Sequence, residues 1–416
     1  MNGTKVETVH GHQKIFHEPL TRDDVEIVVK RALGSSSKLL SYYVKCFSND
    51  KVGFMGTHRH LVVSVQNQEE PNHKPEQHIF FLKSMPYDIE EQLSFMEDTG
   101  NFAKEANFFR QIMPELLSGQ KDKSWSPSCY LVKDDLLVFE DLSSRNFTTR
   151  GQILDLVSLK SALSSLAKLH ASSILAEKRL GKSLAELYSE PLRECMFVLD
   201  GKFGEWFRTG VDVVVAIAKR AGLDSSRLPE ICHRVHDKLS SVKKGRKVIC
   251  HGDSWSNNLM FDDSEPFPKC VLVDFQLMRY VPAMADVAQL FYLTTTRQFR
   301  DKNEVQLLEH YWKVFCETLK EGDGLVYRPS LDEILEEYEE MRLVGIVTAS
   351  LYFPVNQIES KLCLEMTKDS DGFANLLYRH RVELILGLMD RDPAYAEKIL
   401  GIVIEMVERS EQLMTC

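Results

Sequence analysis

The feature of this sequence that most constrains its fold is the stretch between residues 248 and 276. An apolar run leads into a His-Gly-Asp turn that ends at Asp253, and a second short apolar run follows Asn258. The next segment is polar and rich in proline, which is typical of a hairpin loop. A returning strand over 270–276 carries Asp274 near its end. This order of strand, loop and hairpin predicts that Asp253, Asn258 and Asp274 lie close together.

These three side chains suit phosphoryl transfer. That reaction needs a carboxylate that orients and deprotonates the attacking hydroxyl, and oxygen ligands that hold Mg2+ on the nucleotide phosphates. Protein kinases place an Asn five residues after the catalytic Asp and a metal-binding Asp on the next hairpin. Asp253 and Asn258 have this spacing, and Asp274 follows on the predicted hairpin. A surface turn and a strand end that match by chance are the alternative, which the combination of all three residues disfavours.

Composition excludes several classes of protein. The chain has 416 residues, enough for two or three domains, and its net charge of -10 argues against a general nucleic-acid or anionic-membrane surface. No run approaches the ~20 apolar residues of a membrane span, and the N-terminus has no apolar signal-peptide core. Nine scattered cysteines without CxxC spacing indicate free thiols in a reducing compartment. We therefore expect a cytoplasmic protein without nucleic-acid or membrane partners.

The first third of the chain predicts one helix and several strands. Residues 1–19 are polar and are expected to form a flexible arm, after which Thr21 and Asp24 are suited to cap a helix. The loop 48–57 holds two glycines, which either cover phosphates with backbone N–H groups or form an ordinary hairpin. The strand-like runs are 41–47, 59–65, 78–82, 129–132 and 136–140.

Lys83 directly follows an apolar strand. A lysine in this position can reach inward to nucleotide phosphates, and it then needs a carboxylate partner. Glu105, on a helix predicted over 100–110, is the candidate partner. The alternative is a lysine that extends to solvent beside a solvated glutamate. The segment 248–276 favours the paired interpretation.

The run Val138-Phe139-Glu140-Asp141-Leu142 ends the last of these strands. In a two-lobed kinase the chain here passes from the small to the large lobe, and adenine would bind backbone groups near residues 139–142. We place the domain boundary at this point. Residues 20–141 are predicted to form the N-terminal lobe and residues 142–416 the C-terminal lobe.

The remainder of the chain predicts a mostly helical domain. His170 lies on the apolar face of one helix and is interpreted as a hydrogen-bonded core residue rather than a catalyst. Asp286 either reaches back to the 251–253 turn or merely favours a helix N-terminus. Ser330 and Glu333 form a capping-box pattern. The expected helices are 159–177, several over 184–245 with a break at 201–204, 282–300, 303–321, 330–350, 373–389 and 392–412.

Taken together, these residues resemble the ecdysteroid-kinase-like family, also called EcKinase or CHK-kinase-like. The family is related to aminoglycoside phosphotransferases and choline kinases. Trp255 and the Asp274-Phe275-Gln276 ending distinguish the chain from those relatives. The resemblance implies an α+β, protein-kinase-like two-lobed fold, with a small antiparallel-sheet N-lobe and a large, mostly helical C-lobe.

By resemblance, Asp253 matches the catalytic Asp, and Asn258 and Asp274 match the Mg2+ ligands. The residues that match nucleotide-binding positions are Lys83, Glu105, Glu140, Asp141 and Leu142. The family's usual glycine turn is replaced here by a Gly53-Phe54-Met55-Gly56 segment, so the phosphate contacts of the 48–57 loop are left open.

The expected activity is phosphorylation by ATP and Mg2+ of a hydroxyl on a small lipophilic molecule, either an ecdysteroid or a plant or xenobiotic alcohol that is being detoxified. One alternative is a catalytically inactive kinase-like binding module. Another is a choline- or aminoglycoside-type kinase. A protein kinase is disfavoured, because the sequence lacks His-Arg-Asp and Ala-Pro-Glu segments and Phe275 is followed by Gln276. Aromatic residues between 352 and 378 either line the acceptor pocket or pack between helices.

Overall fold

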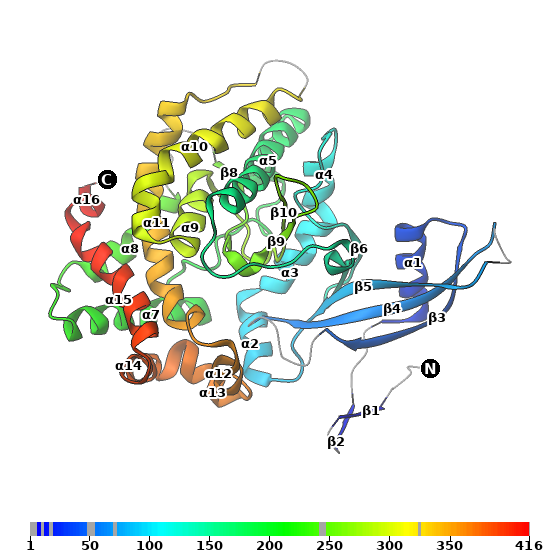
Figure 1. Ribbon diagram of the computed structural model, residues 1–416, viewed down its shortest axis with the longest axis horizontal. Coiled ribbons are helices and arrows are strands. Elements are labelled where there is room, and N and C mark those ends of the chain that lie inside the picture. Colours follow the sequence, from blue (N-terminus) through cyan, green and yellow to red (C-terminus); the bar gives the residue numbers. More distant parts are fainter. Residues whose placement is uncertain are drawn as a thin grey trace. The chain divides into compact units, whose positions relative to one another are not determined.

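The structure, a computed structural model, describes residues 6–9, 12–15, 20–47, 55–69, 73–240, 247–322 and 326–415. The chain forms two compact units (Figure 1). The first comprises the residues up to Pro86 together with Ser128–Ser144, and the second comprises Tyr87–Pro127 and Arg145–Cys416. A sheet dominates the first unit and helices dominate the second, which confirms the predicted α+β class.

The first unit is built on a five-stranded antiparallel sheet with the strand order β3-β4-β5-β7-β6. All five predicted strands are present, three of them longer than expected. Their bounds are β3 (Ser37–Cys46), β4 (Thr57–Asn67), β5 (Glu76–Ser84), β6 (Cys129–Val132) and β7 (Leu136–Glu140). A 3-10 turn, η2 (Leu142–Arg145), follows β7.

Helix α1 (Arg22–Leu33) belongs to the same hydrophobic core as the sheet. The predicted cap is confirmed, because the Thr21 side chain accepts from the Asp24 N–H and the Asp24 carboxylate accepts from Thr21 in return. Val25 and Val28 are buried in a core with Phe80 and Leu82 of β5. Side chains alternate across a strand, so Lys83 lies on the opposite face of the sheet from this core.

Two predicted segments of the first unit are described only in part. Of the predicted arm 1–19, β1 (Val6–Val9) and β2 (His12–Ile15) form an antiparallel pair, and the other residues lie outside the described chain. Residues 48–54 of the predicted phosphate loop also lie outside it. The boundary predicted between residues 141 and 142 stays a prediction, since compact units need not coincide with functional domains. Residues 87–127, which that prediction assigned to the N-lobe, lie in the second unit.

The second unit contains most of the helices. They are α2 (Glu90–Thr99), α3 (Asn101–Asn107), the π-helix η1 (Phe108–Ile112), α4 (Met113–Leu117), α5 (Leu156–Leu180), α6 (Leu184–Leu187), α7 (Gly201–Arg220), α8 (Leu228–Ser240), η3 (Ser256–Asn258), α9 (Met284–Thr294), α10 (Arg297–Leu319), α11 (Leu331–Asn356), α12 (Ser360–Met366), α13 (Ser370–Ala374), the π-helix η4 (Asn375–Arg379), α14 (Arg381–Arg391), α15 (Pro393–Glu408) and α16 (Ser410–Thr415). None of the described helices has the length and apolarity needed to cross a membrane.

Several helix ends differ from the predicted ones. The break expected at 201–204 is instead the start of α7, and the helix expected over 282–300 stops at Thr294. Thr296 caps a new helix there, because its side chain accepts from the N–H of Phe299. The Ser330–Glu333 capping box is confirmed, and α11 continues past the expected end at 350 through Pro354.

Two short two-stranded antiparallel sheets lie among these helices. β8 (Lys247–Cys250) pairs with β11 (Arg279–Pro282), and β9 (Leu259–Asp262) pairs with β10 (Lys269–Leu272). The strand predicted to run to residue 276 therefore ends at Leu272. The backbone leaves the extended conformation because Asp274 adopts a left-handed conformation, with φ of 66°.

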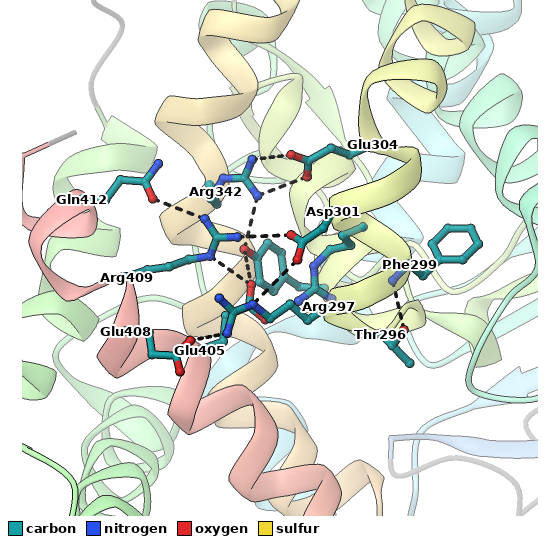
Figure 2. A network of polar contacts seen from close by, with 12 residues as sticks. Thr296, Arg297, Phe299, Asp301, Glu304, Arg342, Glu405, Glu408, Arg409 and Gln412 are labelled. Atoms are coloured by element: carbon teal, nitrogen blue, oxygen red, sulfur yellow. Dashed lines mark hydrogen bonds and ion pairs between the residues drawn. The ribbon is translucent and has the colours of Figure 1, made fainter.

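Charged side chains connect α10, α11 and α15 (Figure 2). Arg300 and Glu405 are buried and form an ion pair. Arg342 is buried as well and contacts Glu304 at 2.8 Å, while Arg409 contacts Glu405 at 3.2 Å. Each buried charge in this network faces one of opposite sign, so the network can stabilise the packing of the C-terminal helices.

Candidate active site

The turn after β8 is held by a carboxylate from α9. The Asp286 oxygens accept hydrogen bonds from the backbone N–H groups of His251 at 2.5 Å and Gly252 at 2.9 Å. Asp286 therefore reaches back to the turn, which decides between the two interpretations of this residue. Burial alone would raise the pKa of Asp286, but the hydrogen bond and charge of His170 lower it below the ordinary value.

Gly252 fits this turn for two reasons. Its φ is 79°, in the left-handed region that favours glycine, and a Cβ there would lie 2.0 Å from the carbonyl oxygen of Leu277. The Gly252 carbonyl also accepts from the side-chain amide of Gln289 at 3.1 Å. The backbone contact explains why a side chain such as the arginine of protein kinases cannot occupy this position.

Asp253 and Asn258 are in direct contact. The Asn258 amide nitrogen donates to the backbone carbonyl oxygen and to Oδ2 of Asp253, each at 2.9 Å. The short η3 helix creates this contact by folding the five-residue interval into a turn, in which the N–H of Asn258 donates to Trp255. Asp253 is only 6% exposed, so its carboxylate has lost most of its contact with water.

Asp274 lies beside this pair because its neighbours are anchored. The N–H of Val273 donates to the carbonyl of Asn258 at 3.0 Å. Phe275 is fully buried and stacks on Phe108, with ring centroids 4.9 Å apart. The N–H of Phe275 donates to Glu105 Oε1 at 3.0 Å. The structure thus brings Asp253, Asn258 and Asp274 together and places Glu105 against the same segment.

The electrostatics of Asp253 follow from this arrangement. Burial raises the pKa of Asp253 to about 7, and the negative charge of Asp274 adds to the increase. Hydrogen bonds from Tyr352 and Asn258 oppose it, as does the more distant charge of Arg279. Asp253 is consequently a carboxylate that can exchange a proton near neutral pH.

The residues present fit a divalent cation. Asn258 uses its amide nitrogen on Asp253, which leaves the amide oxygen as the ligand atom, and Asp274 offers a carboxylate. Mg2+ prefers such oxygen ligands. Two neighbouring carboxylates, one of them buried, also form an environment that a cation would stabilise.

His170 and His251 have structural roles. His170 is fully buried, and its two ring nitrogens contact the Tyr311 hydroxyl at 2.8 Å and Asp286 at 3.2 Å, which confirms the predicted core position. Both nitrogens are engaged, so the nearby group of His170, Cys250 and Asp286 has no imidazole ligand left for a metal. His251 donates from Nε2 to the Val273 carbonyl at 3.0 Å and thereby connects the segment after β8 with the segment after β10.

The other predicted nucleotide-binding residues lie in the first unit. Lys83 is buried on β5, opposite His58 of β4, and a Cβ at Gly56 would lie 3.5 Å from its Cε. Glu140 accepts from the N–H of Ser128 at 2.8 Å. Asp141 and Leu142 are buried, and Asp141 accepts from the Ser143 hydroxyl at 2.6 Å. A pairing of Lys83 with Glu105 stays a prediction.

Two further side chains lie near Asp253. Tyr352 is one of the aromatic residues predicted either to line the acceptor pocket or to pack between helices, and Arg279 had no predicted role. The Tyr352 hydroxyl donates to Asp253 Oδ1 at 3.1 Å, and the fully buried Arg279 contacts Glu194 at 3.3 Å and Gln289 at 3.2 Å. Their sequence signal is weak because neither matches a motif, although Arg279 follows the 248–276 stretch by only three residues. The neighbouring aromatics differ from Tyr352, since Phe373 packs against Phe95 in the helical core.

The fold and this cluster of residues define the chain as a kinase of small molecules. More specifically, it belongs to the ecdysteroid kinase-like family, whose model matches residues 58–323. The matched span contains every predicted site residue from Lys83 to Asp274, and the resemblance found in the sequence is confirmed. None of the curated proteins matches the chain.

The solved structures that match this chain share little sequence with it. A choline kinase from Cryptosporidium parvum Iowa II is 11% identical, with 89% of this chain and 97% of that one covered and a TM-score of 0.41. The gentamicin complex of APH(2'')-IIa is 11% identical, with 92% of this chain and 99% of that one covered and a TM-score of 0.40. Choline kinase LicA from Streptococcus pneumoniae is 15% identical, with 84% of this chain and 99% of that one covered and a TM-score of 0.34.

Proposed function

We propose that the protein uses ATP and Mg2+ to phosphorylate a hydroxyl of a small lipophilic molecule, either an ecdysteroid or a plant or xenobiotic alcohol that is being detoxified. The observation that carries this proposal is the contact between Asp253 and Asn258 beside Asp274, within a chain of the ecdysteroid kinase-like family. The lipophilic acceptor follows from the family alone. The net charge of -10 is no independent reason to prefer a cationic acceptor.

Asp253 is the proposed base. Its carboxylate accepts the proton of the substrate hydroxyl while the hydroxyl oxygen bonds to the γ-phosphorus of ATP, and the bond from that phosphorus to the β–γ bridging oxygen breaks to release ADP. A pKa near the working pH suits a group that takes up and returns a proton. Asn258 and Asp274 would hold Mg2+, which supplies positive charge to the phosphates when it is bound.

The nucleotide-binding roles of the remaining residues are also proposals. Lys83 would contact the phosphates. It is a buried lysine on a strand and lies beside Gly56, which suits this role. The backbone of Glu140, Asp141 and Leu142 would bind adenine. For Glu105 we propose that it keeps Asp274 in place through the Phe275 N–H, in addition to its predicted role as a partner of Lys83.

The compartment proposed for this activity is the cytoplasm. The eight cysteines in the described part of the chain are all free, and five of them are buried. Free thiols are usual in a reducing compartment. Small-molecule alcohols and nucleotide are the proposed partners.

The test is phosphotransfer from labelled ATP to a library of steroid and phenolic alcohols, read by mass spectrometry, with an Asp253→Asn variant of equal folded content beside the wild type. We expect Mg2+-dependent product with the wild type and a loss of at least about a hundredfold with the variant. A variant as active as wild type would refute the role of Asp253. Nucleotide binding without transfer to any alcohol would favour the inactive binding module, and transfer to choline or an aminoglycoside alone would refute the lipophilic acceptor.

A further inference from the structure

The hydroxyl of Tyr352, which follows Asp253 by 99 residues in the sequence, contacts the proposed base from helix α11. It donates to Asp253 Oδ1 at 3.1 Å, while the Asn258 amide nitrogen donates to Oδ2 at 2.9 Å. Each oxygen of the carboxylate therefore has its own donor. The last side-chain torsion of an aspartate is broad and weakly restrained, so two donors on the two oxygens fix the plane of the carboxylate.

The Tyr352 ring is itself held in place. It packs edge to face against Trp206 of α7, with ring centroids 5.8 Å apart, and its hydroxyl lies 3.5 Å from the sulfur of Met196. Trp206 and Met196 are both buried. The donor is thus fixed by side chains that do not belong to the loop on which Asp253 lies.

We propose that Tyr352 is a positioning residue, which together with Asn258 fixes the Asp253 carboxylate in the orientation that receives the acceptor hydroxyl. This inference rests on the proposed function of Asp253 and adds a requirement that the sequence motifs do not contain. Small errors in the placement of a reacting group reduce rates strongly, so fixing the carboxylate serves the chemical step more than substrate binding.

The other charged and polar groups around Asp253 in the described chain do not donate a hydrogen bond to its carboxylate. Asp274 lies beside it, the His251 ring accepts from its N–H at 3.3 Å, and Arg279 pairs with Glu194. Within the described chain, Tyr352 and Asn258 are the side chains with a hydrogen bond to the Asp253 carboxylate. This makes Tyr352 the natural residue to vary, since Asn258 is also proposed to hold the cation.

The experiment compares Tyr352→Phe with Tyr395→Phe. Tyr395 of α15 is a matched control. Its hydroxyl donates at 2.6 Å to the carbonyl of Pro354, which lies in α11 like Tyr352, and it has no hydrogen bond to Asp253 in the described structure. For Tyr352→Phe we expect kcat to fall about tenfold with the KM for ATP and for the acceptor within about twofold, which corresponds to one hydrogen bond to a charged group. Tyr395→Phe should lower the unfolding temperature and leave kcat unchanged.

A second measurement is independent of activity. Tyr352→Phe and, beside it, Tyr352→Leu are each made in the wild type and in an Asp253→Ala background, and thermal unfolding is recorded for all of them. We expect both changes to lower the unfolding temperature in the wild type and to have less effect in the Asp253→Ala background, since the partner is then absent. Tyr395→Phe should act equally in both backgrounds.

The outcomes separate this inference from the proposed function. An unchanged kcat together with equal unfolding shifts in both backgrounds would overturn the role of Tyr352. If Asp253→Asn kept its activity, the proposed function would fail, while the unfolding comparison would still show whether the two side chains are coupled. A phosphate found on Tyr352 by mass spectrometry after incubation with ATP would also overturn the inference, because the hydroxyl would then be an acceptor.

Discussion

Two regions of the second unit bury charged side chains, and they differ in how the charges are matched. Between α10, α11 and α15, the guanidinium of Arg300 contacts the carboxylate of Glu405, and both side chains are almost fully buried. After β8, the buried carboxylate of Asp253 instead has a second carboxylate, Asp274, beside it, and its direct hydrogen-bond donors are the neutral groups of Asn258 and Tyr352.

This difference separates a structural network from a candidate active site. A buried ion pair compensates part of its desolvation cost internally, so it needs nothing further from solution. Two neighbouring carboxylates remain unfavourable until a proton or a cation joins them. The raised pKa of Asp253 is the sign of this condition. We infer that the second region is kept for binding and chemistry at the expense of stability.

The largest expected effect concerns activity at the second region. Asp253→Asn keeps the shape of the side chain but removes the base, so phosphotransfer should fall about a thousandfold. Steady-state kinetics with an alcohol from the proposed class would measure it. Glu408→Gln, on the exposed rim of the first region, is the matched control and should leave the activity unchanged.

The next effect concerns stability at the first region. Glu405→Gln leaves the buried Arg300 without its charged partner, and we expect a loss of about 3 kcal/mol in the free energy of unfolding. Chemical denaturation would measure this loss. Activity per folded molecule should stay at the wild-type level. A variant as stable as wild type would show that the network does not carry the packing of α15.

The two regions should also differ in their dependence on pH. Asp253 binds its proton more tightly in the folded state, with a pKa of about 7, than in the unfolded chain, where the value is 3.8. The stability contributed by this proton is present below pH 3.8 and is lost as the pH rises through about 7. Each pKa unit of difference between the folded and unfolded states corresponds to about 1.4 kcal/mol in the free energy of unfolding, before solvent relaxation reduces it.

We therefore expect the metal-free wild type to lose about 2 kcal/mol more stability between pH 5 and pH 8 than Asp253→Asn does. Comparing the two proteins cancels the contribution of Glu337, whose burial also raises its pKa to about 7. Unfolding by denaturant at several pH values, in the presence of a chelator, is the measurement. If the free energies of unfolding of the two proteins changed in parallel with pH, the raised pKa of Asp253 would be contradicted.

The smallest effect concerns α11, the helix that contributes Arg342 to the first region and Tyr352 to the second. Ser330→Ala removes the side chain that accepts from the N–H of Glu333 and should cost about 1 kcal/mol of stability. Thermal unfolding would detect this, and kcat should not change. A loss of kcat at full folding would show that the N-terminus of α11 is coupled to the distant Tyr352.

The parts of the site that are local in sequence could be predicted. Asp253 and Asn258 are five residues apart on one turn and are in contact, and Asp274 follows the adjacent hairpin close enough to affect the pKa of Asp253, so spacing and the order of strands and loops predicted the cluster. The capping residues Thr21 and Ser330 were predictable for the same reason, because a cap depends on a side chain and a backbone N–H three residues away.

The parts that depend on packing could not be predicted. Tyr352 reaches Asp253 only because α11 lies beside α9 in the folded unit, and no local pattern encodes that neighbourhood. The break between α9 and α10 was predicted too late in the chain, between helices expected over 282–300 and 303–321. It lies at Thr295 and Thr296, where the Thr296 side chain caps α10. The early end of β10 depends on the left-handed backbone of Asp274, which is uncommon for a residue other than glycine.

The most direct test of the central claim is to titrate the Asp253 carboxyl carbon by NMR in protein with carbon-13-labelled aspartate, using Asp253→Asn to assign the signal. In metal-free protein we predict a midpoint near 7, which should fall when Mg2+ and nucleotide are added, because a cation favours the charged carboxylate. A midpoint near the ordinary value of 3.8, or one that does not move on addition of Mg2+ and nucleotide, would contradict the account.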